Sequence, residues 1–225
     1  MSYIAGRVLF IPVARAALAV AAIAGLAAAA LPVGLTSACL AAPEPDPVPK
    51  RWELNINPGP LRVATVDLPD GGVKTFFYFT YKAVNNTGTD LLFAPSFELS
   101  TEQGDLIHAG RDVPSAVTDE ILRRLDHPFL QDQINVIGQI LQGEENAKEG
   151  LVIWPVPTVK PGTVSIYVKG FSGETKVIDV PDKTAGAVKR ITLSKQYMLR
   201  YNLPGELDLK DSAPLPVTER RWIMR

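Results

Sequence analysis

The sequence of 225 residues is poor in the side chains that most enzymes use for chemistry. It has one cysteine, Cys39, and two histidines, His108 and His127. A single cysteine excludes an intramolecular disulfide, so a folded domain must be held together by its core. Two histidines without an H-E-x-x-H or C-x-x-C pattern, and without an Asp-rich calcium loop, argue against a metal site. We therefore expect neither a metal nor a small-molecule cofactor.

Motifs for nucleophilic and phosphate chemistry are also missing. The run Gly170-Phe171-Ser172-Gly173 is one position short of the nucleophile elbow G-x-S-x-G, and it lies between two expected strands instead of before a helix. Adjacent carboxylates such as Glu144-Glu145 are chain neighbours, whereas acid–base pairs face each other across a cleft. We predict that the protein is not an enzyme, with a divergent hydrolase as one alternative.

Acidic residues are absent from the first 42 positions, where the only charges are Arg7 and Arg15. Residues 16–35 carry no charge, and alanine dominates their first half. Positive charge followed by a long apolar run and then by small residues is the pattern of an export signal. About 20 apolar residues also suffice to span a bilayer. We predict that residues 1–42 form an apolar targeting helix, a signal peptide or membrane anchor, and that the protein is exported to the cell envelope.

Three fates of this segment stay open. The run Leu35-Thr36-Ser37-Ala38-Cys39 resembles the bacterial lipobox, although its leucine stands one position early, and Cys39 is therefore a candidate for lipidation. Cleavage after Ala38 without acylation is the second fate, and retention as an anchor is the third. Lipidation or retention would make the membrane a partner.

Proline alternates with other residues just after the leader. Because each proline fixes φ, we expect residues 43–51 to form an extended, semi-rigid spacer. Without the two leader arginines, the chain has 21 basic residues against 24 acidic ones. That balance does not suggest nucleic-acid binding, which favours a basic stripe, and we expect no nucleic-acid partner.

Residues 52–209 are predicted to form one β-rich domain. Alternating apolar and polar residues, separated by turn signals every ~10 residues, favour a sandwich or barrel. In the last alternating run, Lys195 is the exception on the apolar side. The expected strands are 61–68, 74–84, 91–100, 106–108, 164–169, 175–180 and 191–201.

One region interrupts the alternation. Residues 118–120 can begin a helix, an apolar stripe follows, and His127-Pro128 ends it. Residues 130–141 fit either a helix or a strand. We predict a helical insert near residues 115–133 that covers one end or edge of the sandwich.

Two groups of turn and strand residues resemble a known family. The first is the turn 85–88 followed by Phe97-Glu98-Leu99 and the turn 103–105, and the second is Gly143-Glu144-Glu145 followed by residues 150–157. Together they resemble exported bacterial immunoglobulin-like domains that follow a lipoprotein or secretory signal. The resemblance spans roughly residues 52–205 and implies an immunoglobulin-like antiparallel β-sandwich. It implies little chemistry, because most such domains have no assigned activity.

The leading hypothesis is a non-catalytic envelope module that binds another protein through an edge strand, the insert or the tail. Residues 210–225 are the predicted tail, in which Arg220, Arg221 and Trp222 place basic charge beside an aromatic ring. These three are our candidate interaction residues.

Carbohydrate or polymer binding is the alternative from another class. Trp52, Trp154 and Trp222 would stack on sugars if they were exposed on a flat face. Trp154 stands in an apolar run, and we expect it in the core.

Overall fold

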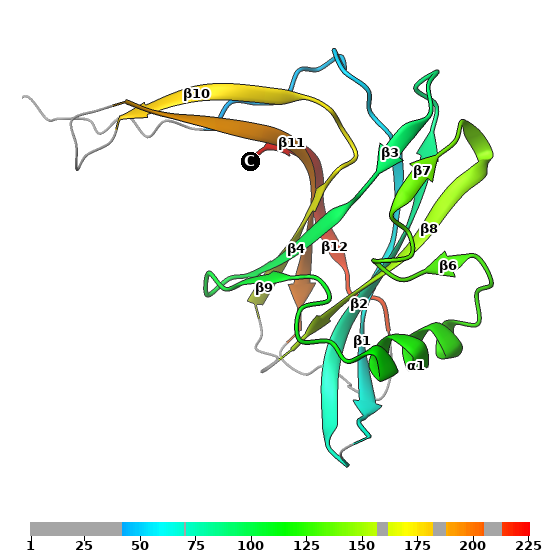
Figure 1. Ribbon diagram of the computed structural model, residues 1–225. Helices are drawn as coiled ribbons and strands as arrows, with labels where there is room; N and C mark the ends of the chain where they lie inside the picture. Colours follow the sequence, from blue (N-terminus) through cyan, green and yellow to red (C-terminus); the bar gives the residue numbers. More distant parts are fainter. Residues whose placement is uncertain (1–41, 70, 157–161, 182–187, 205–212) are drawn as a thin grey trace, which may run out of the picture. The chain divides into compact units, whose positions relative to one another are not determined.

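The computed structural model describes residues 42–69, 71–156, 162–181, 188–204 and 213–225. The predicted targeting helix and Cys39 lie outside these residues. Within them, the chain is mainly β-structure with one short helix, and two sheets face each other (Figure 1). This arrangement confirms the mainly β, sandwich-like fold that the alternating pattern predicts.

The first sheet is built around the aromatic strand β2. Its order is β1-β2-β8-β6, with bounds β1 (Asn55–Asp67), β2 (Val73–Asn85), β8 (Gly143–Pro155) and β6 (Leu130–Gln131). β2 has an antiparallel partner on each side, so that Phe77 pairs with Val63 of β1 and with Trp154 of β8. Aromatic residues occupy both faces of β2 because both faces are covered: one by the core between the two sheets and the other by the cluster that includes α1.

The second sheet is built around β11, the longest strand. Residues 197–203 of β11 pair with β9, residues 188–194 with β10, and residues 195–201 with β12. The order β5-β4-β9 continues the sheet on the β9 side. The bounds are β4 (Ser96–Thr101), β5 (Leu106–His108), β9 (Gly162–Lys169), β10 (Thr175–Pro181), β11 (Val188–Leu203) and β12 (Val217–Met224).

An aromatic-rich core fills the space between the two sheets. The ring of Tyr81 lies 4.8 Å from that of Phe97, and Phe93 meets Phe171 edge-on at 5.1 Å between centroids. Trp154 is fully buried in the same cluster. Each such side chain contributes about 1.5–3 kcal/mol by leaving water, so this core can hold a domain that has no disulfide.

The helix α1 (Ser115–Leu125) covers the outer face of the first sheet. Val117 and Ile121 are buried there against the outward side chains of β1, β2 and β8. The helix begins three residues before Thr118, with Pro114 at the N-cap position in an extended conformation and without a side-chain cap hydrogen bond. It packs on a face of the sheet, where the sequence suggested an end or an edge.

The ambiguous segment after the helix is a strand, a turn and another strand. β6 pairs with β8 in parallel, and β7 (Gly138–Ile140) pairs with β3 (Leu91–Phe93). The turn between them is set by Asp132, whose carboxylate accepts backbone N–H bonds from Ile134 at 2.7 Å and Asn135 at 2.9 Å. Val136, fully buried, anchors this turn to the body of the sandwich.

Candidate interaction surfaces

The hairpin formed by β10 and β11 extends past the sandwich as a two-stranded ribbon (Figure 1). We call residues 175–181 and 188–194 the arm. They pair from Thr175 opposite Ser194 to Pro181 opposite Val188. β12 accompanies β11 no further than Ser194, so among the described residues both outer edges of the arm lack a neighbouring strand.

The two faces of the arm differ in character. One face carries Val177 and Val188, which are 59% and 67% exposed, together with an ion pair in which Arg190 Nε lies 3.1 Å from Asp179. The other face, which we call the apolar face, is half-buried and consists of Ile178, Val180, Ile191 and Leu193. Because side chains alternate along a strand, the apolar face continues the inner face of β11 beyond the core.

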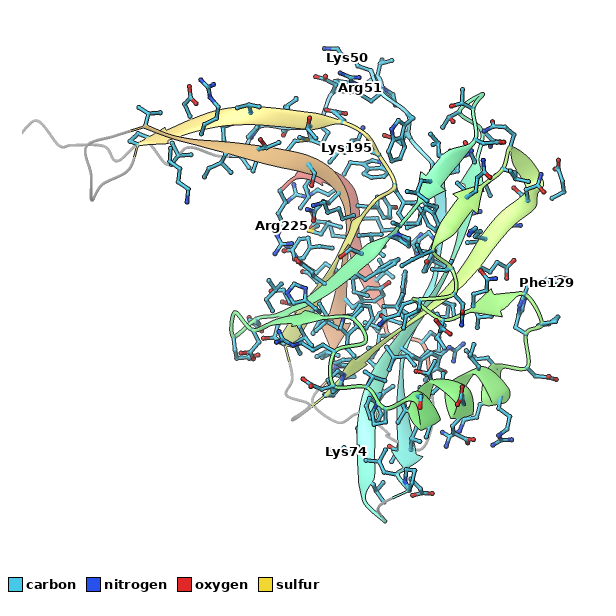
Figure 2. All side chains as sticks on the ribbon, in the orientation of Figure 1. Lys50, Arg51, Lys74, Phe129, Lys195 and Arg225 are labelled. Atoms are coloured by element: carbon cyan, nitrogen blue, oxygen red, sulfur yellow. The ribbon has the colours of Figure 1, made fainter. Side chains whose placement is uncertain are left out.

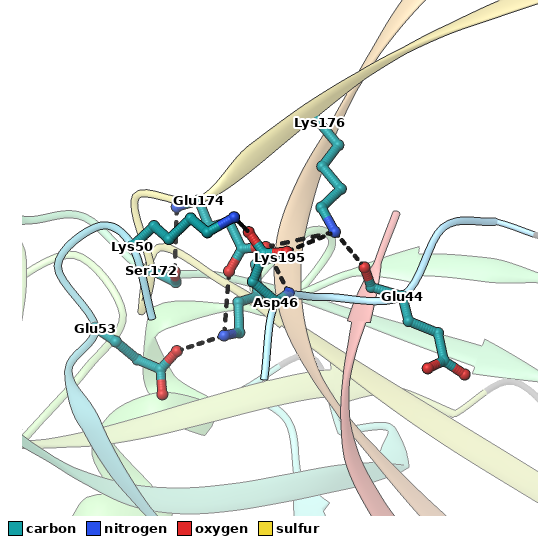
Figure 3. A network of polar contacts seen from close by, with 8 residues as sticks. All are labelled: Glu44, Asp46, Lys50, Glu53, Ser172, Glu174, Lys176 and Lys195. Carbon is teal, nitrogen blue, oxygen red and sulfur yellow. Dashed lines mark hydrogen bonds and ion pairs between the residues drawn. The ribbon is translucent and has the colours of Figure 1, made fainter. Parts of the chain in front are cut away.

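A buried lysine lies at the end of the core, where the arm joins the sandwich (Figure 3). The Lys195 side chain is 3% exposed, and its Nζ lies 2.7 Å from Glu53 Oε2 and 3.2 Å from Glu174 Oε2. The Trp222 ring lies 5.3 Å from the same nitrogen. Burial alone would lower the pKa of Lys195, but the hydrogen bonds that it donates to both glutamates, and their charge attraction, outweigh burial and raise the pKa. The ammonium group therefore stays charged inside the protein.

The base of the arm joins three segments that are distant in sequence. Backbone hydrogen bonds run from Leu54 to Phe171 at 2.8 Å and from Gly173 to Trp52 at 3.0 Å. These bonds carry Glu53 and Glu174 to the same point. Gly173 lies against the Trp52 indole, where a Cβ would stand 2.4 Å from Nε1, so the close approach requires glycine.

The proline-rich segment lies against this base. We call residues 42–50 the strap. Its Asp46 N–H donates to Glu174 Oε1 at 2.9 Å, and the Asp46 carboxylate lies 3.3 Å from Lys176 Nζ on β10 and 3.1 Å from Lys50 Nζ. Lys176 also donates to the carbonyl of Glu44 (Figure 3). Hydrogen bonds from Lys50 and then Lys176 lower the pKa of Asp46. The segment predicted as a spacer thus contacts the arm.

A second surface lies along the insert. Of the ten large hydrophobic side chains that are exposed among the described residues, half belong to β3 or to residues 129–141. We call these five the insert surface: Leu92 at 76% exposed, Phe129 at 74%, Ile134 at 73%, Ile137 at 50% and Leu141 at 44%. The concentration of half the exposed apolar side chains in so short a part of the chain distinguishes it from the rest of the surface.

Local structure holds the insert surface outward. On the β3–β7 pair, Phe93 and Ile140 point inward and are fully buried, so their neighbours Leu92 and Leu141 point out. Ile137 N–H donates to the carbonyl of Ile134 at 3.2 Å, which places these two residues across one turn. Figure 2 shows Phe129 beside β6, on the opposite side of the molecule from the arm.

Both histidines form partly exposed pairs with glutamates. His127 Nε2 lies 3.3 Å from Glu149 Oε2 at a cleft of about 300 Å³ between the end of α1 and the outer face of the first sheet. His108 Nδ1 lies 3.4 Å from Glu98 Oε1. No three His, Cys, Asp or Glu side chains of the described residues gather closely enough to hold a metal ion.

The predicted tail residues stand in the edge strand β12. Trp222 pairs with Tyr197 of β11, and their rings meet at 5.0 Å, so the indole is only partly exposed. Arg220 and Arg221 are exposed, and Arg221 Nε lies 3.0 Å from Glu219. Arg220 lies opposite Leu199, on the same face of β12 as Trp222, whereas Arg221 lies on the other face opposite Met198. The three residues therefore do not form one exposed patch.

Comparison of the chain with protein-family models, with curated proteins and with solved structures found no match in any of the three. Within the part of the chain that the structure describes, no helix combines the length and apolar character needed to cross a bilayer. The case for function accordingly rests on the surfaces themselves.

Proposed function

We propose that the protein is a non-catalytic module of the cell envelope, an immunoglobulin-like β-sandwich that binds another protein through the insert surface. The observation that carries this proposal is that five exposed apolar side chains fall in β3 and residues 129–141. Exposed apolar patches on soluble domains mark sites of association, because a partner removes them from water.

The pairing order supports the immunoglobulin-like assignment. In that fold, the first, second and fifth strands share one sheet, and the third, sixth and seventh share the other. The main strands follow this rule, with β1-β2-β8 in one sheet and β4-β9-β11 in the other. β6 occupies the place of the fourth strand beside β8, although it runs parallel to β8.

The N-terminal sequence supports export and attachment. An acid-free leader with an uncharged run at residues 16–35 suits a signal or an anchor. The intact mass of the protein from the membrane fraction distinguishes acylation at Cys39, cleavage after Ala38 and retention of the leader. Recovery of an unmodified full-length chain only from the cytosol would contradict the envelope assignment.

Photocrosslinking in the native envelope tests the binding surface. A photoreactive amino acid at position 134 is expected to give a discrete adduct with one partner protein. The matched control carries the same residue at Val73, which is 63% exposed but belongs to another part of the surface. Equal labelling from both positions, or none from position 134, would contradict the proposal.

A charge substitution provides the second measurement. Ile134→Asp should reduce adduct formation at the neighbouring position 137 about tenfold or more, because burying a carboxylate in an apolar interface is costly. The thermal midpoint should stay unchanged, since the side chain is 73% exposed. Val73→Asp should change neither quantity.

The alternatives find less support. Trp154 is fully buried and cannot stack on a sugar. Trp52, which precedes β1, and Trp222, on β12, are both partly buried. For a hydrolase, each imidazole lies near a glutamate carboxylate on a partly exposed surface, at 3.4 Å for His108 and 3.3 Å for His127.

A further inference from the structure

We propose that the arm is a membrane-contact element, whose apolar face lies against an anionic lipid surface. This inference rests on the tethered form of the proposed function, in which the leader is acylated or retained. It concerns a different surface from the insert surface, and its partner is lipid instead of protein.

The strap brings the start of the described chain to the base of the arm. Glu44 and Asp46 contact Lys176, and Asp46 also bonds to Glu174. From Glu44 back to Cys39 is five residues, which span at most about 18 Å when fully extended. From Glu44 back to Leu35, the end of the uncharged run, the limit is about 32 Å. A lipid attachment at either point therefore holds the base of the arm within that distance of the bilayer.

The length of the arm is comparable to this limit on the distance that separates its base from the bilayer. Seven residues of β-strand extend about 22–24 Å. A two-stranded ribbon is at best marginally stable alone in water, and three strands or a packed face are normally needed. The apolar face of the arm, with Ile178, Val180, Ile191 and Leu193, has no facing sheet among the described residues. A lipid surface would supply the missing apolar contact.

Charge favours anionic lipid over a second copy of the chain. The described arm has three basic residues, Lys176, Lys189 and Arg190, against one acidic residue, Asp179, whereas the whole chain has a net charge of −1. Lys176 and Lys189 share the face that carries Ile178 and Ile191. Lys176 already contacts the Asp46 carboxylate and the Glu44 carbonyl of the strap, so Lys189 supplies the ammonium group that reaches anionic headgroups at a bilayer. In a face-to-face pair of arms, Lys189 would instead approach the basic residues of the other copy.

The open edges limit how deeply the arm can enter. Unpaired backbone N–H and C=O groups are not tolerated in the hydrocarbon interior, because no water is present to satisfy them. Both edges of the arm carry such groups among the described residues. The arm should therefore lie in the headgroup region, with its apolar side chains at the boundary of the acyl chains.

Depth-dependent quenching of the full-length protein in lipid vesicles tests the proposal. A fluorescent amino acid is placed at position 191 on the apolar face, at position 177 on the opposite face, or at position 134 on the insert surface. Vesicles of phosphatidylcholine, with and without phosphatidylglycerol, carry a nitroxide quencher either near the headgroup or near the chain end. We expect quenching at position 191 above that at 177 and 134, stronger with the shallow quencher, and stronger with phosphatidylglycerol.

Two charge variants should change the binding of the arm to lipid in opposite directions. Lys189→Gln should lower the ratio of lipid-contacting to free arm about fivefold in vesicles that contain phosphatidylglycerol, because each basic residue near such a surface contributes about that factor. Asp179→Asn removes a negative charge from the same arm and should raise that ratio. The two effects should disappear in phosphatidylcholine alone.

The outcomes separate the two proposals. If the full-length protein fails to float with vesicles, the tethered form of the proposed function and the membrane contact both fail. If it floats but position 191 is quenched no more than position 134, the membrane contact alone is overturned. Strong quenching near the chain end, or crosslinking of arms between two copies at position 191, would also overturn it.

Discussion

A single buried lysine shows how one residue determines local structure in this protein. Lys195 interrupts an otherwise apolar run in the sequence, and the structure gives the reason: its ammonium group is enclosed by Glu53 and Glu174 at the end of the core. Bringing three charges out of water is unfavourable by several kcal/mol per ion unless they compensate one another. Removal of any one of the three charges therefore leaves the others without compensation.

Removal of this lysine should be strongly destabilising. Lys195→Met leaves two carboxylates in a site made for a cation, and we expect the free energy of unfolding to fall by about 3–5 kcal/mol. Urea denaturation measures the loss. Replacing Glu53 and Glu174 by Gln in the same variant should recover part of it, and Lys189→Met on the exposed part of the same strand is the neutral control. A loss of under 1 kcal/mol for Lys195→Met would show that the site is not charged.

The same site sets a direction for the dependence of stability on pH. Because the folded-state pKa of Lys195 is raised above its ordinary value of 10.5, the ion pairs contribute fully below that pH. The contribution should decline as the pH rises through the raised pKa. Wild-type stability should therefore fall in strongly alkaline urea titrations, and the Lys195→Met variant should lack this part of the decline.

At the scale of single elements, α1 is stabilised mainly by its packing against the first sheet. It has 11 residues, a length at which an isolated helix is marginal in water. The helix also lacks a side-chain acceptor for its first backbone N–H groups, because the N-cap residue is Pro114. Val117 and Ile121 supply the buried contacts that compensate.

Shortening a buried side chain of α1 should lower the stability of the whole domain. Ile121→Ala removes a side chain that is 1% exposed, and we expect the free energy of unfolding to fall by about 2–5 kcal/mol. Asp119→Ala, on the exposed face of the same helix, should change it by less than about 0.5 kcal/mol. Chemical denaturation followed by circular dichroism measures both. Similar values for the two variants would mean that the helix is not docked on the sheet.

Sequence patterns predict the elements of this protein unequally. Period-two alternation located strands such as β9 and β11 because one face of each lies in the interior. It did not indicate most of β8 or β12, which are absent from the expected strands. Residues 130–141 stayed ambiguous because their apolar spacing suits two periods, and the turn that Asp132 organises has no period at all. The predicted insert and α1 both begin at residue 115, but residues 118–120, expected to cap the helix, lie inside it, and Pro114 holds the N-cap position.

At the scale of the whole molecule, the sequence could not predict which distant segments meet. Lys195 was visible as an exception, but its partners lie 142 positions before it and 21 positions before it in the chain. The sequence also does not predict which apolar residues of the insert surface are exposed, because that depends on which of their neighbours point into the core. The strap was expected to stand clear of the domain, and its contacts with the arm arise only from the tertiary fold.

The strap contact can be tested apart from the membrane and from any partner. Lys176→Ala removes the cation that binds the Glu44 carbonyl and the Asp46 carboxylate. We expect faster hydrogen exchange at the Asp46 amide, which bonds to Glu174, with no change in global unfolding. Lys189→Ala is the control on the same arm. The wild-type contact should also weaken in acid, because the pKa of Asp46 lies below its ordinary value of 3.8 and the ion pair is lost as the pH falls through the lowered value. Unchanged exchange in Lys176→Ala would mean that the strap is free of the arm, and the distance limit between the arm and a tethering bilayer would then no longer hold.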